Sequence, residues 1–410
     1  MTAALLAPAS EEEAARLVAE CALRNTRLRL CGGGTRSGFG NRVNAEATLS
    51  SRGLSGIVAY DPAEMVLTAK AGTPMAEIEA AVAEAGQALA FEPPDHRALM
   101  ATSGTPTIGG VFASNASGPR RLLAGAARDH LLGLRFVNGR GEIIKAGGRV
   151  MKNVTGLDLV KLLAGSFGTL GFLTEVTFKV MPRPRASACL VLSGLDDGAA
   201  ARAMAAAMAL PVEVNGAAHL PELVSPRLIA GRLPAGPATI FRLEGLPASV
   251  SERLEKLAWV LGRLGPVSRV EDGESASLWQ AVGDVMPFAD GTEKPVWRVS
   301  MAPMRGHELV AGLRLHAAID AFYDWQGGLV WMRMEEEPEA GLIRAGLAAL
   351  GGGHASLLRA TSSIRNGLAA FQPETAGVAL LSERLRRSLD PAGIFNPGLM
   401  HRPADRAEGA

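Results

Sequence analysis

The chain has 410 residues, of which 42 are basic and 41 acidic, so its formal net charge is +1. A composition of 48% hydrophobic and 20% charged residues excludes a disordered protein, and the balanced charge excludes the basic surface that nucleic-acid binding requires. Three separated cysteines without a CxxC pair exclude a disulfide framework and a cysteine zinc site. No apolar run approaches the roughly 18 residues of a membrane span, and the acidic N-terminus lacks the features of a signal peptide. We therefore expect a soluble, cytoplasmic globular protein of about two or three domains.

The first part of the chain alternates predicted helices and strands. Ser10 is a helix cap, and Gly86 ends a later helix. The expected helices cover residues 11–25, 74–85 and 158–163, and the expected strands cover residues 27–31, 56–60, 65–69, 133–137, 143–146 and 174–180. The Pro-rich segment 181–185 breaks this pattern and predicts a domain boundary.

Beyond this boundary, strands and helices follow in a β-α-β-β-α order that repeats loosely. This order predicts a second α+β domain, with an antiparallel sheet covered by helices on one side. The expected strands are 189–195, 212–217, 239–243, 296–302, 328–334 and 356–360, and the expected helices are 198–209, 251–264, 308–317 and 339–350. Residues 381–400 are predicted to form a helix followed by turns.

Glycines are clustered, and the first cluster is CGGGTRSGFG at residues 31–40, directly after a strand. Glycines at this point allow positive φ and turn backbone N–H groups to one side, which forms a nest for phosphate oxygens. No lysine follows in the GxxxxGK[ST] spacing, so nucleotide hydrolysis is not indicated. Taken alone, such a turn is more often structural than functional.

Three further clusters follow: TIGGVFASNASG at residues 107–118, GSFGTLGFLTE at residues 165–175 and Asn396-Pro397-Gly398. The second is compatible with a capped helix and a solvated basic turn, or with a helix start that cradles part of a ligand. Each cluster is a weak signal alone, but their order and separations form a specific set.

This ordered set resembles the flavin domain of the vanillyl-alcohol oxidase (PCMH-type) flavoprotein family, over the first 182 residues and about the last twenty. Within that family, the run NVTGLDLVKLLAGSFGTLG at residues 153–171 and the Pro-Arg-Pro boundary are most similar to the second FAD-binding subunit of bacterial glycolate oxidases. The resemblance implies an α+β fold: a PCMH-type two-lobed FAD-binding domain at residues 1–182, an α+β cap domain with an antiparallel sheet at 183–380, and a C-terminal segment at 381–410 that returns to the FAD domain.

The resemblance also implies which residues hold a non-covalent FAD, because the histidine that anchors the cofactor in some relatives is replaced by Gly33-Gly34-Thr35. Asn396 would return from the tail to the flavin ring. The residues implied for the pyrophosphate are Gly32, Gly33, Gly34, Thr35 and Ser37; for the ribityl chain and ring, Pro94, Asp95, Thr107, Gly109, Gly110, Asn115 and Gly118; and for the adenine side, Gly171, Phe172 and Thr174.

Several positions depart from the metal-dependent members of the family. The seven histidines include no close pair, and Glu335-Glu336-Glu337 has no neighbouring histidine, so no metal site is expected. Phe167 stands where relatives often carry glutamate.

Candidate catalytic groups in the chain are few. Arg298, on a predicted cap strand, is a candidate for binding a carboxylate substrate, and His96 is a candidate acid or base, although a structural role is the commoner reading for each. Trp279, Trp331 and Arg333 are candidates for lining the open face of the flavin.

The resemblance implies an FAD-dependent oxidoreductase subunit of a glycolate oxidase complex, which oxidises glycolate to glyoxylate and passes electrons to an iron–sulfur subunit. The partners would be a related catalytic flavin subunit and the iron–sulfur subunit, because this chain has no cysteine set for a cluster. The location would be cytoplasmic, with peripheral contact to the inner membrane only through the complex. The alternatives are a self-sufficient FAD oxidoreductase for another 2-hydroxy acid or an alcohol, and a non-catalytic scaffold that keeps the flavin fold.

Overall fold

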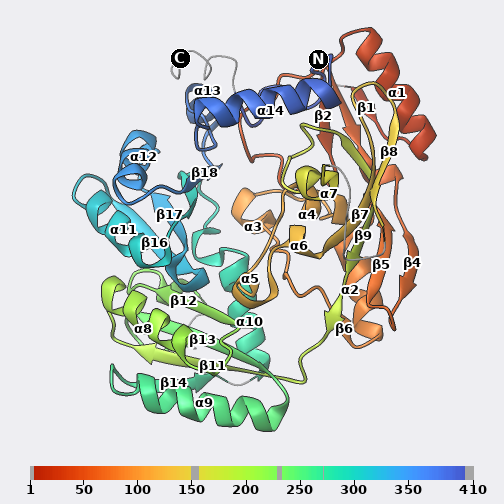
Figure 1. Cartoon of the computed structure of the whole chain (residues 1–410). Coiled ribbons are helices and arrows are strands. Elements are labelled where there is room, and N and C mark those ends of the chain that lie inside the picture. The colour runs from red at the N-terminus through yellow and green to blue at the C-terminus, as the bar shows by residue number, and fades with distance from the viewer. Residues whose placement is uncertain (1–3, 149–156, 229–232, 271, 402–410) are drawn as a thin grey trace.

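The computed structural model describes residues 4–148, 157–228, 233–270 and 272–401. Residues 153–156 of the run at 153–171 lie outside this description. The chain forms two units that lie side by side, an N-terminal unit of two lobes and a cap (Figure 1). Among the described residues, no helix is long and apolar enough to cross a membrane.

The first lobe of the N-terminal unit is a small parallel sheet packed against a helix. Its strands lie in the order β1 (Ala4–Leu6), β3 (Ala47–Ser50) and β2 (Leu28–Cys31). Helix α1 (Glu11–Leu23) begins where Ser10 accepts a hydrogen bond from the amide of Glu13, as predicted. β1 and β3 were not predicted, because each has only three or four residues and no clear alternation.

The second lobe is a five-stranded antiparallel sheet, and the third glycine cluster leads directly into its central strand. Its strand order is β4 (Ile57–Asp61), β5 (Val66–Lys70), β9 (Phe172–Lys179), β7 (Leu131–Val137) and β8 (Ile143–Gly147). The helices of this lobe are α2 (Met75–Glu84), α3 (Arg97–Met100), α4 (Ile108–Ala113), α5 (Arg121–Ala124), α6 (Ala127–His130) and α7 (Leu159–Leu163). Its core is rich in buried phenylalanines, among them Phe91, Phe112, Phe136 and Phe178.

The chain passes to the cap through a short extended segment. β10 (Met181–Pro182) still pairs with β6 (Gln87–Ala88) of the N-terminal unit, whereas β11 (Ala186–Ser193) already belongs to the cap sheet. We therefore propose to keep the domain boundary after Pro182.

The cap is an eight-stranded sheet in which all pairings between the described strands are antiparallel. The order is β14 (Val267–Val270), β11, β13 (Ala238–Gly245), β12 (Gly216–Leu220), β16 (Ile319–Asp324), β17 (Leu329–Met334), β15 (Val296–Ser300) and β18 (His354–Arg359). The antiparallel α+β cap is thus confirmed. The predicted strand at 212–217 is displaced, because Val212 and Val214 are buried in the turn that precedes β12.

Helices cover both faces of the cap sheet, which corrects the expected one-sided cover. α8 (Asp197–Ala209), α9 (Pro247–Leu261), α11 (Gly306–Arg314) and α12 (Ala340–Ala349) lie on the outer face, away from the N-terminal unit (Figure 1). α10 (Asp272–Gly283) packs on the inner face, where its Trp279 contacts the core formed by Cys189 and Val191, whereas Leu190 and Leu192 face α8 and α9. α10 was missed because its sequence, DGESASLWQAVG, is rich in glycine and serine.

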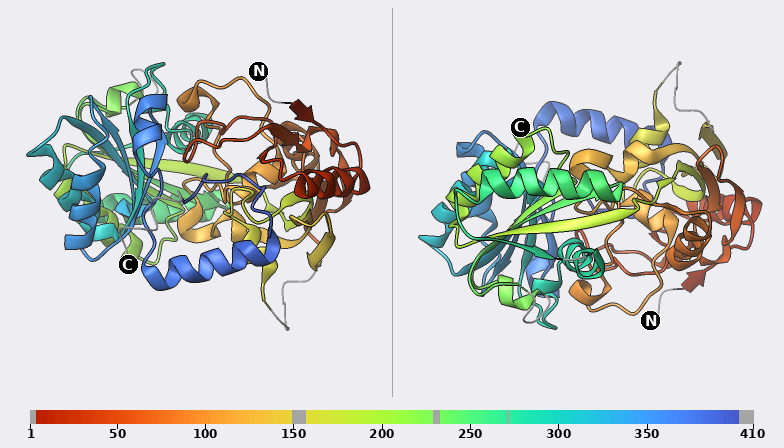
Figure 2. Two further views of the ribbon diagram at one scale, coloured as in Figure 1. Left: turned by 90° about the horizontal axis from the view of Figure 1, so that it is seen from above. Right: turned by 90° about the horizontal axis from the view of Figure 1, so that it is seen from below.

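The C-terminal part joins the two units. α14 (Ala376–Leu389) lies along the upper side of the molecule and ends at the N-terminal unit (Figures 1 and 2), where the amide of Gly139 donates to the carbonyl of Leu389. Because α14 begins at Ala376, the predicted boundary at 380/381 falls inside a helix, and we propose to move it to the start of α14.

Candidate functional site

A cavity of about 530 Å³ lies between the two lobes of the N-terminal unit. The glycine clusters, which are distant in the sequence, meet in its walls. The lining comes from the first cluster and its flanks (29–37, 39, 41–43), from residues 51 and 71, from the second and third clusters (107, 109, 110, 113, 114, 167, 168, 171–173), from residues 362 and 365, and from the tail (396, 399).

The first glycine loop offers free backbone donors to this cavity. Within the described part of the chain, the amides of Gly33, Gly34 and Thr35 donate no hydrogen bond. Gly34 has φ +80°, and a side chain at Gly33 is excluded because its Cβ would lie 1.5 Å from the carbonyl oxygen of Thr105. Amides held this way form a concave nest that suits an anion such as a pyrophosphate.

The second loop forms the opposite wall through the start of α4. Thr107 caps this helix, its Oγ1 accepting from the amide of Gly110. Gly109 packs against Ala71, directly after β5, because a Cβ there would lie 2.7 Å from the carbonyl oxygen of Ala71. A Cβ at Gly110 would meet only Thr107 Oγ1, at 3.3 Å, so packing alone does not require this glycine. Its lack of a side chain keeps the cavity open.

The tail closes the third wall through Asn396, whose side chain is 3% exposed. Its Oδ1 accepts from the amide of Leu30 at 2.8 Å, and its Nδ2 donates to the carbonyl of Phe167 at 2.8 Å. Asn396 therefore joins β2 of the first lobe to the third glycine turn of the second lobe.

Most residues implied for FAD line this cavity, and five do not. The residues that line it are Gly32, Gly33, Gly34, Thr35, Ser37, Thr107, Gly109, Gly110, Gly171, Phe172 and Asn396. Pro94 and Asp95 line a second cavity, of about 940 Å³, between the N-terminal unit and the cap.

The other three residues have structural contacts instead. Asn115 Oδ1 accepts from the amide of Arg128 at 2.8 Å, and Thr174 Oγ1 donates to Glu11 Oε1 at 2.5 Å. Gly118 packs against the backbone of Glu92, since a Cβ would lie 2.4 Å from that carbonyl oxygen.

Arg36 is a lining residue of both cavities that the sequence reading did not single out. Its Nη2 donates to the carbonyl of Pro94 at 2.8 Å. Burial lowers the pKa of Arg36 to about 10, against the opposing effect of Asp95 and Asp284. Burial also raises the pKa of Asp284 to about 6, although this carboxylate accepts the amide of Asp95. The only sequence signal for Arg36 was its position next to the GGGT run.

The two catalytic candidates meet on the inner face of the cap sheet. Arg298 on β15 pairs in register with Trp331 on β17, and the ring of His96 contacts Trp331 edge-on, with 5.9 Å between centroids. Burial, with Arg36 and Arg298 nearby, lowers the pKa of His96 to about 3, so the imidazole is neutral at physiological pH. Burial and the neighbouring Arg121 lower the pKa of Arg298 to about 10. Neither His96 nor Arg298 lines either of the two cavities.

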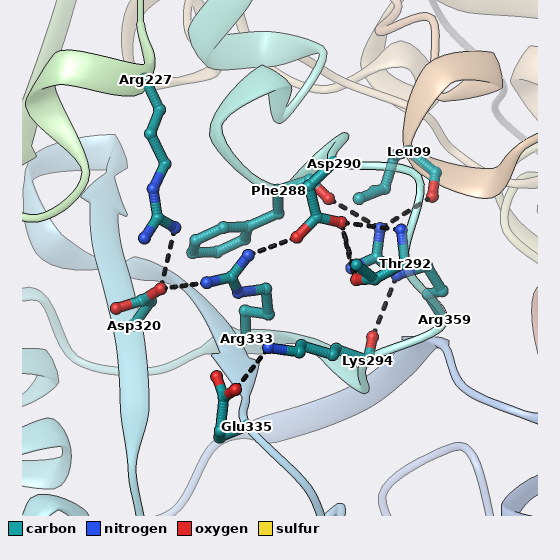
Figure 3. A network of polar contacts seen from close by, with 10 residues as sticks. All are labelled: Leu99, Arg227, Phe288, Asp290, Thr292, Lys294, Asp320, Arg333, Glu335 and Arg359. Carbon is teal, nitrogen blue, oxygen red and sulfur yellow. Dashed lines mark hydrogen bonds and ion pairs between the residues drawn. The ribbon is translucent and has the colours of Figure 1, made fainter.

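The other cap candidates are held in structural contacts. Trp279 and Trp331 are buried, and Arg333 lies between the carboxylates of Asp290 and Asp320 (Figure 3). Glu335 pairs with Lys294. Within the described residues, no group of three or more His, Cys, Asp or Glu side chains is placed to hold a metal ion.

The residues of the cavity fit an extended dinucleotide such as FAD. The free amides of the first glycine loop suit the pyrophosphate. Because Gly110 has no side chain and Gly34 has a positive φ, a cofactor can approach the backbone closely at both positions. We therefore propose that FAD binds in this cavity.

Comparison with known proteins supports this assignment. A family model described as an FAD binding domain matches residues 2–147. Glycolate oxidase subunit GlcE of Escherichia coli (strain K12) is 34% identical over 391 residues, covering 92% of this chain and 93% of that protein. Glycolate oxidase subunit GlcD of Bacillus subtilis (strain 168) is 31% identical over 192 residues, covering 47% of this chain and 39% of that protein. The crystal structure of p-cresol methylhydroxylase with substrate bound covers 97% of this chain and 88% of that chain, with a TM-score of 0.73 and 13% identity.

These matches define an FAD-dependent oxidoreductase with the fold of p-cresol methylhydroxylase. Within that class, the chain belongs to the family of the glycolate oxidase subunit GlcE.

Proposed function

We propose that the chain is the FAD-binding subunit of a glycolate oxidase complex that oxidises glycolate to glyoxylate. The observation that carries this proposal is the cavity between the two lobes, in which three glycine turns and Asn396 meet. FAD, when bound, supplies the acceptor for the electrons removed from the substrate. The similarity to GlcE over 92% of the chain supports the assignment to this complex.

The free amides of Gly33, Gly34 and Thr35 would bind the pyrophosphate. Gly109 and Gly110 would allow the ribityl chain to approach α4, and residues 171–173 would border the adenine side. We propose that the cofactor is non-covalent, since the lining residues of this cavity include no histidine. Pro94, Asp95, Asn115, Gly118 and Thr174 would act by supporting these walls.

The partners would be a related flavin subunit and an iron–sulfur subunit. The similarity of 47% of this chain to GlcD supports a paired flavin subunit of common ancestry. The iron–sulfur cluster would come from the third subunit, because the three cysteines of this chain are all free and far apart in the sequence. We propose a cytoplasmic location, with any contact to the inner membrane made through the complex.

The test is the visible absorbance spectrum of the purified chain, followed by acid precipitation and chromatography of the supernatant. We expect a flavin spectrum and release of intact FAD into the supernatant. A folded protein that neither carries FAD nor takes it up from solution would contradict the proposal. Flavin that stays with the precipitate would contradict the non-covalent attachment alone.

Assembly is tested separately by co-expression with a GlcD-type subunit and an iron–sulfur subunit. We expect a single complex by gel filtration, with glycolate-dependent reduction of an artificial acceptor. Elution of this chain apart from both partners would contradict the role as a subunit.

A further inference from the structure

The cavity between the two lobes is lined by cations and by no carboxylate. Of the described residues in its lining, none is aspartate or glutamate, and the arginines are Arg29, Arg36, Arg42 and Arg365. The pyrophosphate of FAD is doubly negative and would offset part of this positive charge. Arg36 already lies near the carboxylates of Asp95 and Asp284, which border the second cavity. The positive charge that remains belongs to the other arginines, and it favours a second anion in the same cavity.

Two of these arginines hold the second half of the first glycine loop. Arg29, on β2, donates from Nη2 to the carbonyl oxygen of Ser37 at 2.8 Å. Arg365 donates from Nε and Nη2 to the carbonyl oxygen of Gly40, at 3.1 and 2.7 Å. Both guanidinium groups are therefore anchored to one turn of the chain, directly after the free amides that suit the pyrophosphate.

Arg365 brings a residue of the cap region into the cofactor cavity. It lies on α13 (Ser362–Gly367), the short helix between β18 and α14, and the lining includes no residue of the eight cap strands. A Cβ at Gly38 would lie 2.8 Å from the methyl carbon of Met100 and 3.9 Å from Nη1 of Arg365. The Arg365 guanidinium thus lies against the glycine loop itself.

The charges of Arg29 and Arg365 oppose each other in this half-buried place. Burial lowers the pKa of Arg365, and the neighbouring charge of Arg29 lowers it further. Among the described residues Arg29 makes no ion pair, and its bond to Ser37 uses one of the five N–H groups of a guanidinium. An anion that accepts hydrogen bonds from both arginines would remove the repulsion and use the remaining donors.

Aromatic rings border the same turn and lower its polarity. Phe39, between the two anchored carbonyl groups, stacks on Phe167 with 4.9 Å between ring centroids, and both residues line the cavity. Phe371 contacts both rings edge-on, with 5.3 Å between centroids in each case. A hydrogen bond between an arginine and an anion is stronger beside such rings than in water.

We propose that Arg29 and Arg365 form a subsite for the carboxylate of a small 2-hydroxy acid inside the cofactor cavity. The inference rests on the proposed function and deepens it, because glycolate is such an acid. The planar guanidinium group matches the two oxygens of a carboxylate. Arg298, the candidate from the sequence, does not line this cavity, so Arg365 takes its place as the arginine beyond the domain boundary that binds the substrate.

The experiment measures anion binding to the FAD-loaded chain by isothermal titration calorimetry at constant ionic strength. The probes are oxalate, a carboxylate that cannot be oxidised by loss of hydride, and glycolamide, the uncharged amide of glycolate. We expect saturable binding of oxalate at millimolar concentration and none of glycolamide. Absence of oxalate binding, or equal binding of both probes, would overturn the inference. Failure of the chain to bind FAD would instead contradict the proposed function.

Arg29→Gln and Arg365→Gln test the two cations separately. Each should weaken oxalate binding at least tenfold, because hydrogen bonds from a charged donor are lost, while FAD affinity stays close to that of the parent. Arg305→Gln removes the same charge from an exposed pair with Glu308, and this control should bind oxalate as the parent does.

The two affinities separate a binding role from a supporting role. Oxalate affinity that is unchanged in both variants, or that falls only in proportion to FAD affinity, would overturn the inference. In the second case the arginines would hold the cofactor or its loop and not the substrate. If Arg365→Gln does not fold because Gly40 is released, Arg29→Gln decides the test.

Discussion

Arg242 on β13 donates from Nη1 and Nη2 to the two carboxylate oxygens of Glu92, at 2.8 and 2.7 Å. Glu92 lies before α3 in the N-terminal unit, so this bidentate pair joins the two units. A second pair crosses the same interface in the opposite sense, from Arg120 of the N-terminal unit to Glu244 on β13, at 2.5 Å. The four residues form one alternating network, and it borders the second cavity between the units.

Replacing Glu92 by glutamine tests this network. Arg242 is 3% exposed, so the variant leaves a buried guanidinium with weaker compensation. The Glu92 side chain is 31% exposed, so water partly compensates for its loss of charge. We therefore expect a moderate loss of about 1–3 kcal/mol in the free energy of unfolding, measured by urea denaturation. The control is Glu308→Gln in the exposed pair with Arg305, where the loss should stay below about 1 kcal/mol. Equal losses of unfolding free energy in Glu92→Gln and Glu308→Gln would show that the Glu92–Arg242 pair stabilises the fold no more than an exposed ion pair does.

Gly110→Ala tests the cofactor cavity. Alanine favours a helix more than glycine does, and a Cβ at Gly110 would meet only the Thr107 hydroxyl, so the fold should be kept. The added methyl group projects at a cavity wall, and we expect FAD affinity to fall at least tenfold, which is about 1.4 kcal/mol, by titration of the deflavinated chain. Gly312→Ala, on the exposed side of α11 with open space around it, should leave FAD affinity unchanged. Undiminished FAD binding by the Gly110 variant would place the cofactor elsewhere.

Local pattern was enough to predict most elements that surround this cavity. The Ser10 cap, the strand before the first glycine loop and the antiparallel cap sheet follow from capping, alternation and turn residues that act over short distances. β16 and α10 were missed. β16 (IDAFYD) contains two acidic residues, of which Asp320 pairs with Arg227 and Arg333. α10 packs through Leu278, Trp279 and Val282 onto strands of the cap. These partners are distant in sequence, so no local pattern reports them.

The same limit applies to the site. The glycines were found because their backbone requirement is local, whereas Arg36, Met100 and Arg365 acquire their positions through tertiary contacts with Pro94, Gly38 and Gly40. His96 and Arg298 were selected by residue type, and only the sheet register shows that they meet at Trp331 and away from the cavity.

Asn396 offers a test of how the tail supports the cavity. Asn396→Ala removes the acceptor for Leu30 and the donor for Phe167, and it places alanine at φ +42°. We expect a loss of about 1–3 kcal/mol in unfolding free energy and weaker FAD binding. Asn396→Asp keeps the acceptor for Leu30 but loses the donor to Phe167. If the bond to Leu30 contributes more than the bond to Phe167, this variant should be less destabilising than alanine at high pH, where the aspartate is ionised. An alanine variant as stable as the parent would contradict the bridging role.

Asp324 on β16 predicts how stability depends on pH. Burial raises the pKa of its carboxyl to about 7 from an ordinary value of 3.8, even though Oδ1 accepts the amide of Trp325 and the cations Arg242 and Arg298 are near, with Glu92 acting against them. The folded state therefore binds more protons than the unfolded state. The stabilisation from this proton is fully present below about pH 4 and is lost as the pH rises through about 7.

Asp324→Asn keeps a similar shape and removes this titration. We expect the variant to gain stability relative to the parent as the pH rises from 5 to 8, by up to about 3 kcal/mol in urea denaturation. Asp197→Asn is the matched control: burial raises the pKa of Asp197, but hydrogen bonds from His219 and Tyr323 outweigh it and hold the pKa at about 2. Its carboxyl is ionised in both states over this range, so the control should lower stability by a constant amount. If the curves of the Asp324 variant and the parent run parallel from pH 5 to 8, Asp324 is ionised in the folded protein and its carboxylate is compensated by Arg242 and Arg298.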